Sequence, residues 1–384
     1  MTSLLLNYHV PMQPSALLAD PRLVLTLDAG GSSFRFAAAQ GGRIVVELPP
    51  APSHAADLSG CLAALKDGFA RARALCSAPP VAISFAFPGP ADYAAGIVGD
   101  LPNFPAFRGG VALGPMLEDE FGLPVHMNND GDLFAYGEAT AGFLPWINER
   151  LGEAGSLKRY SHLLGFTLGT GLGGGLVRGG ELLTGDNEGA ANVHLLRHKL
   201  DPQLNAEEGA SIRAVRREYA ALAGLPLDLA PDPRAIAAIA RGEESGHRDA
   251  ARESYRRLGE VAGDSIAQAC AVFDGLVVVG GGLSGAADLF LPALLSAMNA
   301  QFAGGARLRR LGPRAFNAED PAELSQFLAG ERRELPVPGS RRRVIYDPMA
   351  RVAVGVSRLG TTAAIVLGAY AFALCKLDPS HAPR

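Results

Sequence analysis

Lysine is nearly absent from this 384-residue chain. Only four of its 35 basic residues are lysine, at positions Lys66, Lys158, Lys199 and Lys376, and arginine carries the rest of the positive charge. None of these lysines follows a glycine-rich segment, which excludes a P-loop of the form GxxxxGK[ST]. The lysine of the protein-kinase VAIK motif is missing as well. If the protein binds nucleotide phosphates, it must do so with other groups.

Cysteine and long apolar runs are also scarce. The four cysteines (Cys61, Cys76, Cys270 and Cys375) form no CxxC motif, as is typical of buried thiols in a reducing compartment. The longest apolar stretch, 361–375, falls short of the roughly 18 residues that cross a bilayer. The N-terminus lacks the basic region of a signal peptide. We therefore expect a cytoplasmic protein with no membrane partner.

Charge is low in amount and nearly balanced. Charged residues make up 19% of the chain, hydrophobic residues make up 48%, and the net charge is −4. This composition excludes intrinsic disorder and gives no electrostatic reason to expect a nucleic-acid partner. Because a domain holds about 150 residues, the length favours two domains.

Three short apolar strands are each followed by a glycine-rich turn. The first strand, 23–27, leads into the turn 28–33 and a second strand, 34–39. The pattern returns as a strand over 163–168, a turn over 169–175 and a strand from 176, which indicates an internal duplication. The third strand, 276–279, leads into Gly280–Gly282 and a helical pattern that runs to 298.

The remaining segments alternate between helices and strands. Periodicity predicts helices at 57–76, 111–121, 132–141 and 361–375, and strands at 81–87 and 125–128. Such alternation favours a two-domain α/β protein with a cleft between the domains as the ligand site. We expect an N-terminal extension (1–22), a first domain (23–140, with 360–384 docking back onto it) and a second domain (141–359). The second domain would include a solvated insertion, 314–343, whose Arg341–Arg343 cluster could alternatively make an oligomer contact.

The glycine turns suit an anionic ligand. Glycine allows backbone amides to approach an anion closely, and two related turns indicate a polyphosphate between two domains. Asp28 begins the first turn and is suited to hold hydrated Mg²⁺ beside the phosphates. The second turn adds the hydroxyl of Thr170.

Five segments in this order resemble the sugar kinases of the ROK family (repressors, open reading frames, kinases), within the actin-like ATPase superfamily. They are LTLDAGGSSFRFAA, FPGP, NNDGDLFAYGEATAG, LGFTLGTGLGGGLVRGGELLTG and VVVGGGLSG. The resemblance covers about 23–300 and the C-terminal helix. It implies an actin-like (ribonuclease H-like) fold of two domains and a site for ATP and Mg²⁺.

The resemblance also implies which residues bind the nucleotide. Asp28 to Ser33 would form the first phosphate loop, Gly169 to Gly174 the second, and Gly280 to Gly282 would flank the adenosine. The residues expected to contact ATP are Asp28, Gly30, Gly31, Ser32, Ser33, Gly169, Thr170, Gly171, Gly281 and Gly282. Asp28 would hold the metal through water, because Mg²⁺ keeps most of its hydration shell.

By the same resemblance, Asn129 and Asp130 match the family's asparagine–aspartate pair. Asp130 would be the general base that accepts the proton of the attacking sugar hydroxyl, an effect typically worth about 10²–10⁴-fold. The alternative is a turn that ends the preceding strand and caps the next helix. Within the set of five motifs we favour the catalytic role.

Other sugar contacts rest on weaker matches. Asn103 and Glu207 match sugar-binding positions, but each is equally well explained as a turn residue or an acid at a helix N-terminus. Glu138, after the catalytic pair, is expected to be a helix-surface or structural residue. The full set expected to bind sugar is Asn103, Asn129, Asp130, Asn192, His194 and Glu207.

The chain departs from the family at one motif. Many members have AGEIGH followed by CxCGxxGCxE, which forms a zinc site, whereas no cysteine lies between Cys76 and Cys270 here. We therefore expect no structural zinc, and we consider a metal site at His194 and His198, spaced i, i+4, improbable. Asn192 replaces the family's sugar-binding glutamate, and His194 is one position from its histidine.

The leading hypothesis is an ATP-dependent kinase for a hexose 6-hydroxyl, with glucose as the first candidate. Fructose, mannose and N-acetylhexosamines are alternatives. A transcriptional repressor of the same family is disfavoured, because only about 22 residues precede the first strand and no basic patch suggests DNA binding. A non-catalytic sugar-binding regulator is the other alternative. The family resemblance implies a homodimer.

Overall fold

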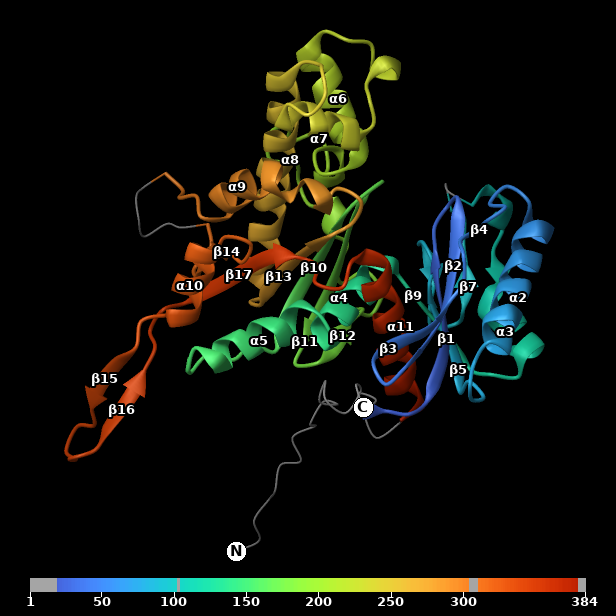
Figure 1. The fold of residues 1–384 in the computed structure, drawn as a ribbon, viewed down its shortest axis with the longest axis horizontal. Coiled ribbons are helices and arrows are strands. Elements are labelled where there is room, and N and C mark those ends of the chain that lie inside the picture. Colours follow the sequence, from blue (N-terminus) through green and yellow to red (C-terminus); the bar gives the residue numbers. More distant parts are fainter. Residues whose placement is uncertain (1–18, 102–103, 304–309, 379–384) are drawn as a thin grey trace, which may run out of the picture. The chain divides into compact units, whose positions relative to one another are not determined.

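The computed structural model describes residues 19–101, 104–303 and 310–378, which divide into two compact units (Figure 1). The first unit contains the chain up to Ala141, Val177–Glu188 and the chain from Thr362 onward. The second unit contains Gly142–Leu176 and Gly189–Thr361. The chain therefore passes from one unit to the other four times. The predicted domains did not include the return at Val177–Glu188.

The first unit is built on a sheet of order β3-β2-β1-β5-β9, with β4 beside β2. Strand β1 pairs antiparallel with β2 and parallel with β5, which pairs parallel with β9. The strands are β1 (Leu23–Ala29), β2 (Ser33–Gln40), β3 (Arg43–Glu47), β4 (Ala51–Pro52), β5 (Ala82–Ala86) and β9 (Val125–Asn128). A smaller sheet contains β6 (Ala91–Asp92), β7 (Ile97–Val98) and β8 (Val111–Ala112).

The helices of the first unit supply the rest of its apolar interior. They are α2 (Leu58–Ala74), α3 (Leu113–Phe121), α4 (Asp130–Thr140) and α11 (Thr361–Leu377), with a short 3₁₀ turn at Pro105–Phe107. Phe69 of α2 contacts Phe36 of β2 edge-to-face, with ring centroids 5.1 Å apart, which is a favourable aromatic geometry. Among the described residues, no helix is both long enough and apolar enough to cross a membrane.

Helices α4 and α11 pack against each other with backbone in contact. A side chain on Gly137 of α4 would collide with the carbonyl oxygen of Ala364, and one on Gly368 of α11 would collide with that of Leu133. Only glycine permits so close an approach of two helices. Most of α11 is buried, so this contact fixes α4 within the first unit.

The end of the N-terminal extension is also attached to α11. The guanidinium of Arg22 binds the carboxylates of Asp20 and Asp378, at 2.6 and 2.7 Å. The hydroxyl of Tyr370 donates to the carbonyl of Asp20 at 2.9 Å. The prediction of a loose extension through residue 22 is therefore wrong for Asp20–Arg22. The residues that hold this segment, Tyr370 and Asp378, lie near the other end of the chain and could not be recognised from local sequence.

The second sheet has the order β12-β11-β10-β13-β17-β14. Its first five strands repeat the order of the first sheet: a pair of strands joined by a glycine turn, a third strand outside it, and two parallel strands on the other side. The strands are β10 (His162–Leu168), β11 (Leu172–Arg178), β12 (Glu181–Leu183), β13 (Leu276–Gly280), β14 (Arg314–Asn317) and β17 (Arg351–Val356). The predicted duplication is thus present in the topology.

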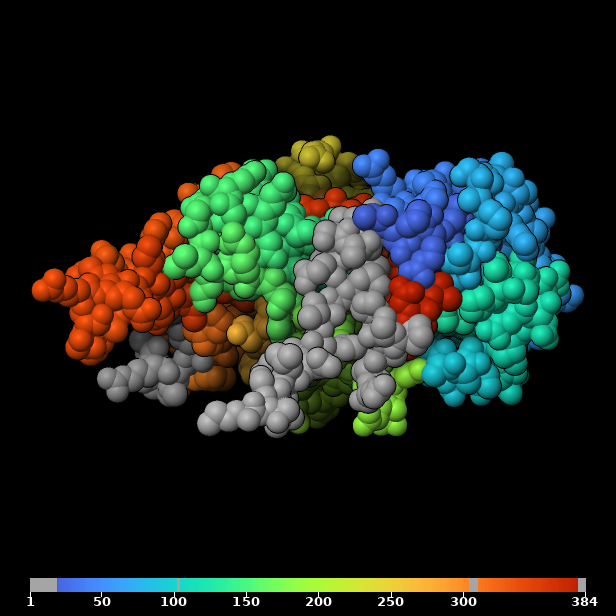
Figure 2. Space-filling view, turned by 90° about the horizontal axis from the view of Figure 1, so that it is seen from below, coloured from blue at the N-terminus to red at the C-terminus, as the bar shows by residue number. Residues whose placement is uncertain are grey.

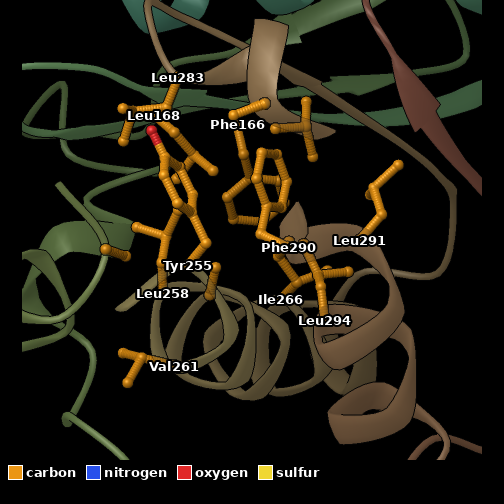
Figure 3. Close-up of a cluster of buried hydrophobic side chains, with 14 of the residues drawn as sticks. Phe166, Leu168, Tyr255, Leu258, Val261, Ile266, Leu283, Phe290, Leu291 and Leu294 are labelled. Carbon is orange, nitrogen blue, oxygen red and sulfur yellow. The ribbon is translucent and has the colours of Figure 1, made fainter. Parts of the chain in front are cut away.

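Helices cover this sheet and enclose the larger hydrophobic core (Figure 3). The helices are α5 (Phe143–Glu153), α6 (Ile212–Ala223), α7 (Pro233–Arg241), α8 (Arg248–Val272), α9 (Ala287–Met298) and α10 (Pro321–Ala329), with 3₁₀ turns at Val193–Leu195, Ala206–Glu208, Leu227–Leu229 and Ser284–Ala286. Tyr255 and Leu258 of α8 and Phe290 of α9 belong to the same buried cluster as Leu168, the last residue of β10. The core therefore anchors the strand that precedes the second glycine turn.

The second glycine turn is shorter than predicted. It contains only Gly169–Gly171, because β11 begins at Leu172 and includes the three glycines that follow. A Cβ on Gly174 would lie 2.7 Å from Val193 and 3.0 Å from the Ala191 carbonyl oxygen. These glycines therefore permit a neighbouring segment to lie closely against a strand. The prediction that 169–175 is all turn was wrong for this reason.

The predicted solvated insertion at 314–343 is only partly exposed. Strand β14 pairs in parallel with β17, and its Ala315 and Phe316 are buried, as is Phe327 of α10. The longest exposed part is the hairpin of β15 (Arg333–Pro336) and β16 (Arg343–Tyr346), all of whose strand residues are exposed (Figure 2). The prediction failed at β14 because four residues are too few to show a period beside an acidic segment.

The contact between α4 and α11 gives a stability prediction. We expect Gly137→Ala to lower the unfolding temperature, with a loss of about 2 kcal/mol or more from overpacking, despite the better helix propensity of alanine. Gly152→Ala in α5 is the matched control, because its Cβ would meet only the end of the flexible Arg159 side chain, at 3.4 Å. Thermal unfolding followed by circular dichroism measures both; equal midpoints for the two variants would contradict the packing argument.

Candidate active site

The strand register of the first unit brings two predicted site segments together. Asp28 of β1 is the partner of Ala86 in β5, and Ala86 is the partner of Asn128 in β9. Three parallel strands therefore end at one edge of the sheet, where ligands bind in open α/β sheets. Asn129 and Asp130 follow directly after β9. Sequence-distant carboxylates thus meet at a common edge.

Asp130 is the first residue of α4, two residues earlier than the predicted helix start. The Gly131 amide donates to the side chains of both Asn129, at 2.8 Å, and Asp130, at 2.9 Å. Asn129 is therefore the N-cap, and an acid in the first turn is favoured by the helix dipole. Asp130 is half-buried; burial raises its pKa, and the hydrogen bond from Gly131 opposes this shift.

Asp28 is held by a residue from the far end of the chain. The Thr362 hydroxyl donates to Oδ2 of Asp28 at 3.0 Å. Burial raises the pKa of Asp28, the hydrogen bond from Thr362 lowers it, and the charge of Asp130 raises it further. The strand register brings both carboxylates to the same edge of the sheet.

Three further residues complete this region, and sequence reasoning missed them. The Asn129 amide donates to the Tyr93 hydroxyl at 3.4 Å, and that hydroxyl donates to the Phe87 carbonyl at 2.9 Å. The Glu188 carboxylate accepts from the amides of Tyr93, at 2.8 Å, and Ala94, at 3.0 Å. Glu188 has φ 53°, a costly backbone conformation for this residue, so these two hydrogen bonds hold it in place.

Asp132 is the third missed residue and is only 6% exposed. Burial raises its pKa to about 8, with further contributions from the charges of Asp130 and Glu188. The signal in the sequence was its position two residues after Asp130, on the first turn of the same helix. Asp132 therefore carries a proton at neutral pH and reduces the negative charge around Asp130.

The first glycine turn is a tight connection between β1 and β2. The Gly30 amide donates to the Ser33 carbonyl at 3.0 Å, which closes the turn. The Ser53 hydroxyl donates to the Gly31 carbonyl at 2.6 Å. Gly31 and Ser32 are exposed. The turn thus has a fixed backbone and an accessible outer side.

Glu207 lies against the second glycine turn. Its carboxylate accepts from the Leu172 amide at 3.1 Å and from Arg213 at 3.1 Å. A side chain on Gly171 would collide with this carboxylate, and Arg213 also donates to the Thr170 carbonyl at 3.4 Å. Glu207 and Arg213 therefore brace the turn, an arrangement that spacing alone did not reveal.

The third glycine turn lies beside the second. The Leu283 amide donates to the Leu168 carbonyl at 3.0 Å, which joins the two turns. A Cβ on Gly169 would meet nothing nearer than the Gly282 amide nitrogen, at 4.0 Å. A Cβ on Gly282 would likewise meet only Ile212, at 4.0 Å. Backbone amides with open space beside them fit a phosphate-bearing ligand.

The predicted sugar contacts of the second unit, Asn192, His194 and Glu207, lie in or next to two short 3₁₀ turns. The Ala206 amide donates to the Leu196 carbonyl at 2.7 Å, so the 3₁₀ turn at Val193–Leu195 and the one that holds Glu207 are adjacent. Asn192 is exposed, and His194 is half-buried. Asn103 lies outside the described residues.

The structure bears on two further predictions about individual side chains. His194 and His198 do not share a helix, because the 3₁₀ turn ends at Leu195; the Nδ1 of His198 instead accepts from the amides of Leu200 and Asp201, at 3.1 and 3.0 Å. Glu138 is fully buried, so of its two predicted roles the helix-surface one is wrong and the structural one is left.

The residues present fit a nucleotide-bound Mg²⁺. Within the described ranges, no group of three histidine, cysteine or acidic residues could form a protein cage for a metal. Mg²⁺ at a nucleotide needs only one or two carboxylates, since phosphates and water supply the remaining ligands. Asp28, half-buried and fixed by Thr362, meets this requirement.

Two sheets of the same strand order, each with a glycine turn after its first strand, define an actin-like ATPase fold. Solved structures of low identity share it, among them a ROK family transcriptional regulator that is a homologue of the E. coli MLC protein. That structure has 19% identity and a TM-score of 0.64, covering 94% of this chain and 82% of the other.

The chain belongs to the ROK family, whose sequence profile matches residues 24–322. The resemblance inferred from the motifs is thereby confirmed. A glucokinase of Parabacteroides distasonis has 51% identity and a TM-score of 0.84, over 93% of this chain and 99% of that one. The glucokinase of Thermotoga maritima is 31% identical over 229 residues. That match covers 54% of this chain and 65% of the Thermotoga protein, less than two thirds of its length.

The raised pKa of Asp132 gives a prediction about stability and pH. The folded chain holds this proton up to about pH 8, whereas an unfolded aspartate loses it near pH 4. The contribution of the neutral Asp132 side chain to the free energy of unfolding is therefore fully present below about pH 4 and is lost as the pH rises to 8. Asp132→Asn, which mimics the protonated form, should match the wild type at pH 4 and exceed it by ~2–5 kcal/mol at pH 9.

Thermal unfolding at a series of pH values measures this difference. Asp119→Asn, on the exposed surface of α3, is the matched control and should follow the wild type at every pH. A constant offset between Asp132→Asn and the wild type would show that Asp132 is not buried in its neutral form.

Proposed function

We propose that the protein is an ATP-dependent sugar kinase that transfers the γ-phosphoryl group to the 6-hydroxyl of a hexose, with glucose as the substrate. The observation that carries the proposal is the pair of carboxylates at one sheet edge in a ROK family chain. Asp130 follows β9 and Asp28 ends β1, and their charges interact. Such a pair provides both a base for the acceptor hydroxyl and a position for Mg²⁺.

In the proposed reaction, the chain's main task is to position the reactants. Phosphoryl transfer has a loose transition state, so alignment and electrostatic stabilisation account for most of the catalysis. Asp130 accepts the proton of the sugar 6-hydroxyl while the oxygen of that hydroxyl attacks the γ-phosphorus and ADP leaves. Burial raises the pKa of Asp130, which makes its carboxylate a stronger base.

The glycine turns would hold the nucleotide without a lysine. In this proposal, Gly30 to Ser33 and Gly169 to Gly171 bind phosphates through amides and hydroxyls, while Gly281 and Gly282 flank the adenosine. Mg²⁺, when bound near Asp28, neutralises charge on the phosphates. The open space beside Gly169 and Gly282 supports this assignment.

Sugar selection is assigned to Asn129 in the first unit and to Asn192, His194 and Glu207 in the second. The 51% identity with the Parabacteroides glucokinase supports glucose. Asn192 is a neutral hydrogen-bonding residue where the motif has glutamate, so recognition of the sugar near C1 and C2 is the step in which this chain would differ.

The role of Asp130 is tested by Asp130→Asn. We expect kcat to fall by about 10²–10⁴-fold, with little change in the KM for sugar, because the amide keeps the shape of the carboxylate but cannot accept the proton. A coupled assay of ADP release measures both constants, with Asp119→Asn as the surface control. A kcat above roughly one tenth of the wild-type value would contradict the role of general base.

The substrate is tested by ATP consumption with a panel of hexoses. Glucose should give the highest kcat/KM among glucose, fructose, mannose, N-acetylglucosamine and N-acetylmannosamine. Calorimetry with each sugar provides the second measurement. Sugar binding without ATP consumption would favour the non-catalytic regulator, and a preference for another hexose would reassign the substrate.

A further inference from the structure

Two consecutive threonines at the start of α11 each bind a predicted site residue of their own unit. The Gly281 amide donates to the Thr361 hydroxyl at 2.8 Å. The Thr362 hydroxyl donates to Oδ2 of Asp28 at 3.0 Å. Thr361 is the last residue of the second unit, and Thr362 begins the final segment of the first. Each hydrogen bond lies within one unit, and a single peptide bond joins the two threonines.

We propose that Thr361 and Thr362 are positioning residues that couple the third glycine turn to Asp28, so that nucleotide binding at Gly281–Gly282 and metal binding at Asp28 depend on each other. The proposal rests on the proposed function, because it takes ATP and Mg²⁺ as the ligands. Neither threonine is assigned a contact with the substrate. Their effect is exerted through the turn and the carboxylate.

The Thr361 hydroxyl fixes a turn that has little freedom to compensate for its loss. Gly281 has φ 88°, and a side chain on it would collide with Leu168, so its backbone is held between β10 and β13. Its carbonyl already accepts from the Ser284 hydroxyl at 2.8 Å. Loss of the Thr361 hydroxyl removes the acceptor for the amide of a half-buried residue, a change that costs free energy. The adjoining Gly282 would then lose its defined position.

The Thr362 hydroxyl fixes the orientation of Asp28, because it donates to one of the two carboxylate oxygens. Because this bond engages Oδ2, the other carboxylate oxygen would be left for a metal or its bound water. Partners of this kind orient metal ligands and contribute to metal affinity.

The position of α11 explains why the two effects are coupled. Gly368 and Gly137 hold α11 against α4 with backbone in contact, and α4 begins with Asp130. A shift of Gly281 would therefore displace the start of a helix that is packed tightly against the helix carrying the proposed base. Close-packed elements transmit such displacements. A nucleotide bound at Gly281–Gly282 would therefore affect metal binding at Asp28, and a metal at Asp28 would affect nucleotide binding.

Single substitutions separate the two threonines. Thr362→Val removes the hydroxyl while keeping the shape, and it should raise the Mg²⁺ concentration for half-maximal activity by about 10-fold or more, as expected for a hydrogen bond to a charged group. Thr361→Val should weaken ADP binding by about 2–10-fold, with and without Mg²⁺, as expected for a neutral hydrogen bond. Serine at either position keeps the hydroxyl and should restore the wild-type value.

Calorimetry with ADP provides a readout that does not depend on activity. It is performed with Mg²⁺ and with chelator on the wild type, the single valine variants and the double variant. Thr362→Val should weaken ADP binding only when Mg²⁺ is present. If the residues are coupled, the effect of the double variant will differ from the sum of the single effects. Thr140→Val is the control, because the Thr140 hydroxyl donates only to Tyr136 within α4, at 2.7 Å.

The outcomes distinguish this inference from the proposed function. Equal losses in every constant and in unfolding temperature for both variants, unrescued by serine, would mean a merely structural role and overturn it. Additive effects in the double variant would overturn the coupling. If the wild type consumes no ATP with any hexose but shows the expected ADP and Mg²⁺ dependence, the proposed kinase activity fails and this inference stands.

Discussion

The close approach of α4 and α11 is the constraint on which the first unit depends. The two helices contact each other through backbone atoms at Gly137 and Gly368, which leaves no room for even a methyl group. Asp130 begins one helix, and Thr362 lies at the start of the other. The proposed base and the residue that holds Asp28 thus belong to a single packed pair of helices. This arrangement explains how a C-terminal segment comes to hold Asp28, which lies near the start of the described chain.

The predictable part of the fold came from short apolar runs with clear limits. Strands such as β1 and β13 end at glycine turns, and α2 has a helical period, so both ends of each could be placed from local sequence. Strand β11 was shortened in the prediction because glycine has two structural uses. Gly169 belongs to a turn, whereas Gly174 lies within a strand that Val193 approaches closely. Only the position of the approaching segment separates these uses, and a linear sequence does not contain it.

The residues of the candidate site also fall into those that the sequence could predict and those that it could not. Asp28 and Asp130 could be proposed from motifs, because each directly follows a recognisable strand. Glu188, Tyr93 and Thr362 could not, because their partners are distant in sequence and their side chains are common surface residues in isolation. Asp132 was visible in the motif, but its importance comes from burial beside two other acids. The roles of all these residues in binding and catalysis remain predictions.

The four passages of the chain between its units have a mechanical consequence. Three of the four positions carry or adjoin a glycine: Gly142, Gly189 and Gly360, the last of which has φ 81°. A rearrangement of the units must be absorbed by backbone torsions at a few positions of this kind, where glycine offers little resistance. The fourth passage runs through β11, whose hydrogen-bonded neighbours restrict such torsions. At the last passage, Thr361 and Thr362 are held by hydrogen bonds to Gly281 and Asp28. The backbone torsions at Gly142 and Gly189 are therefore the least restricted of the four passages.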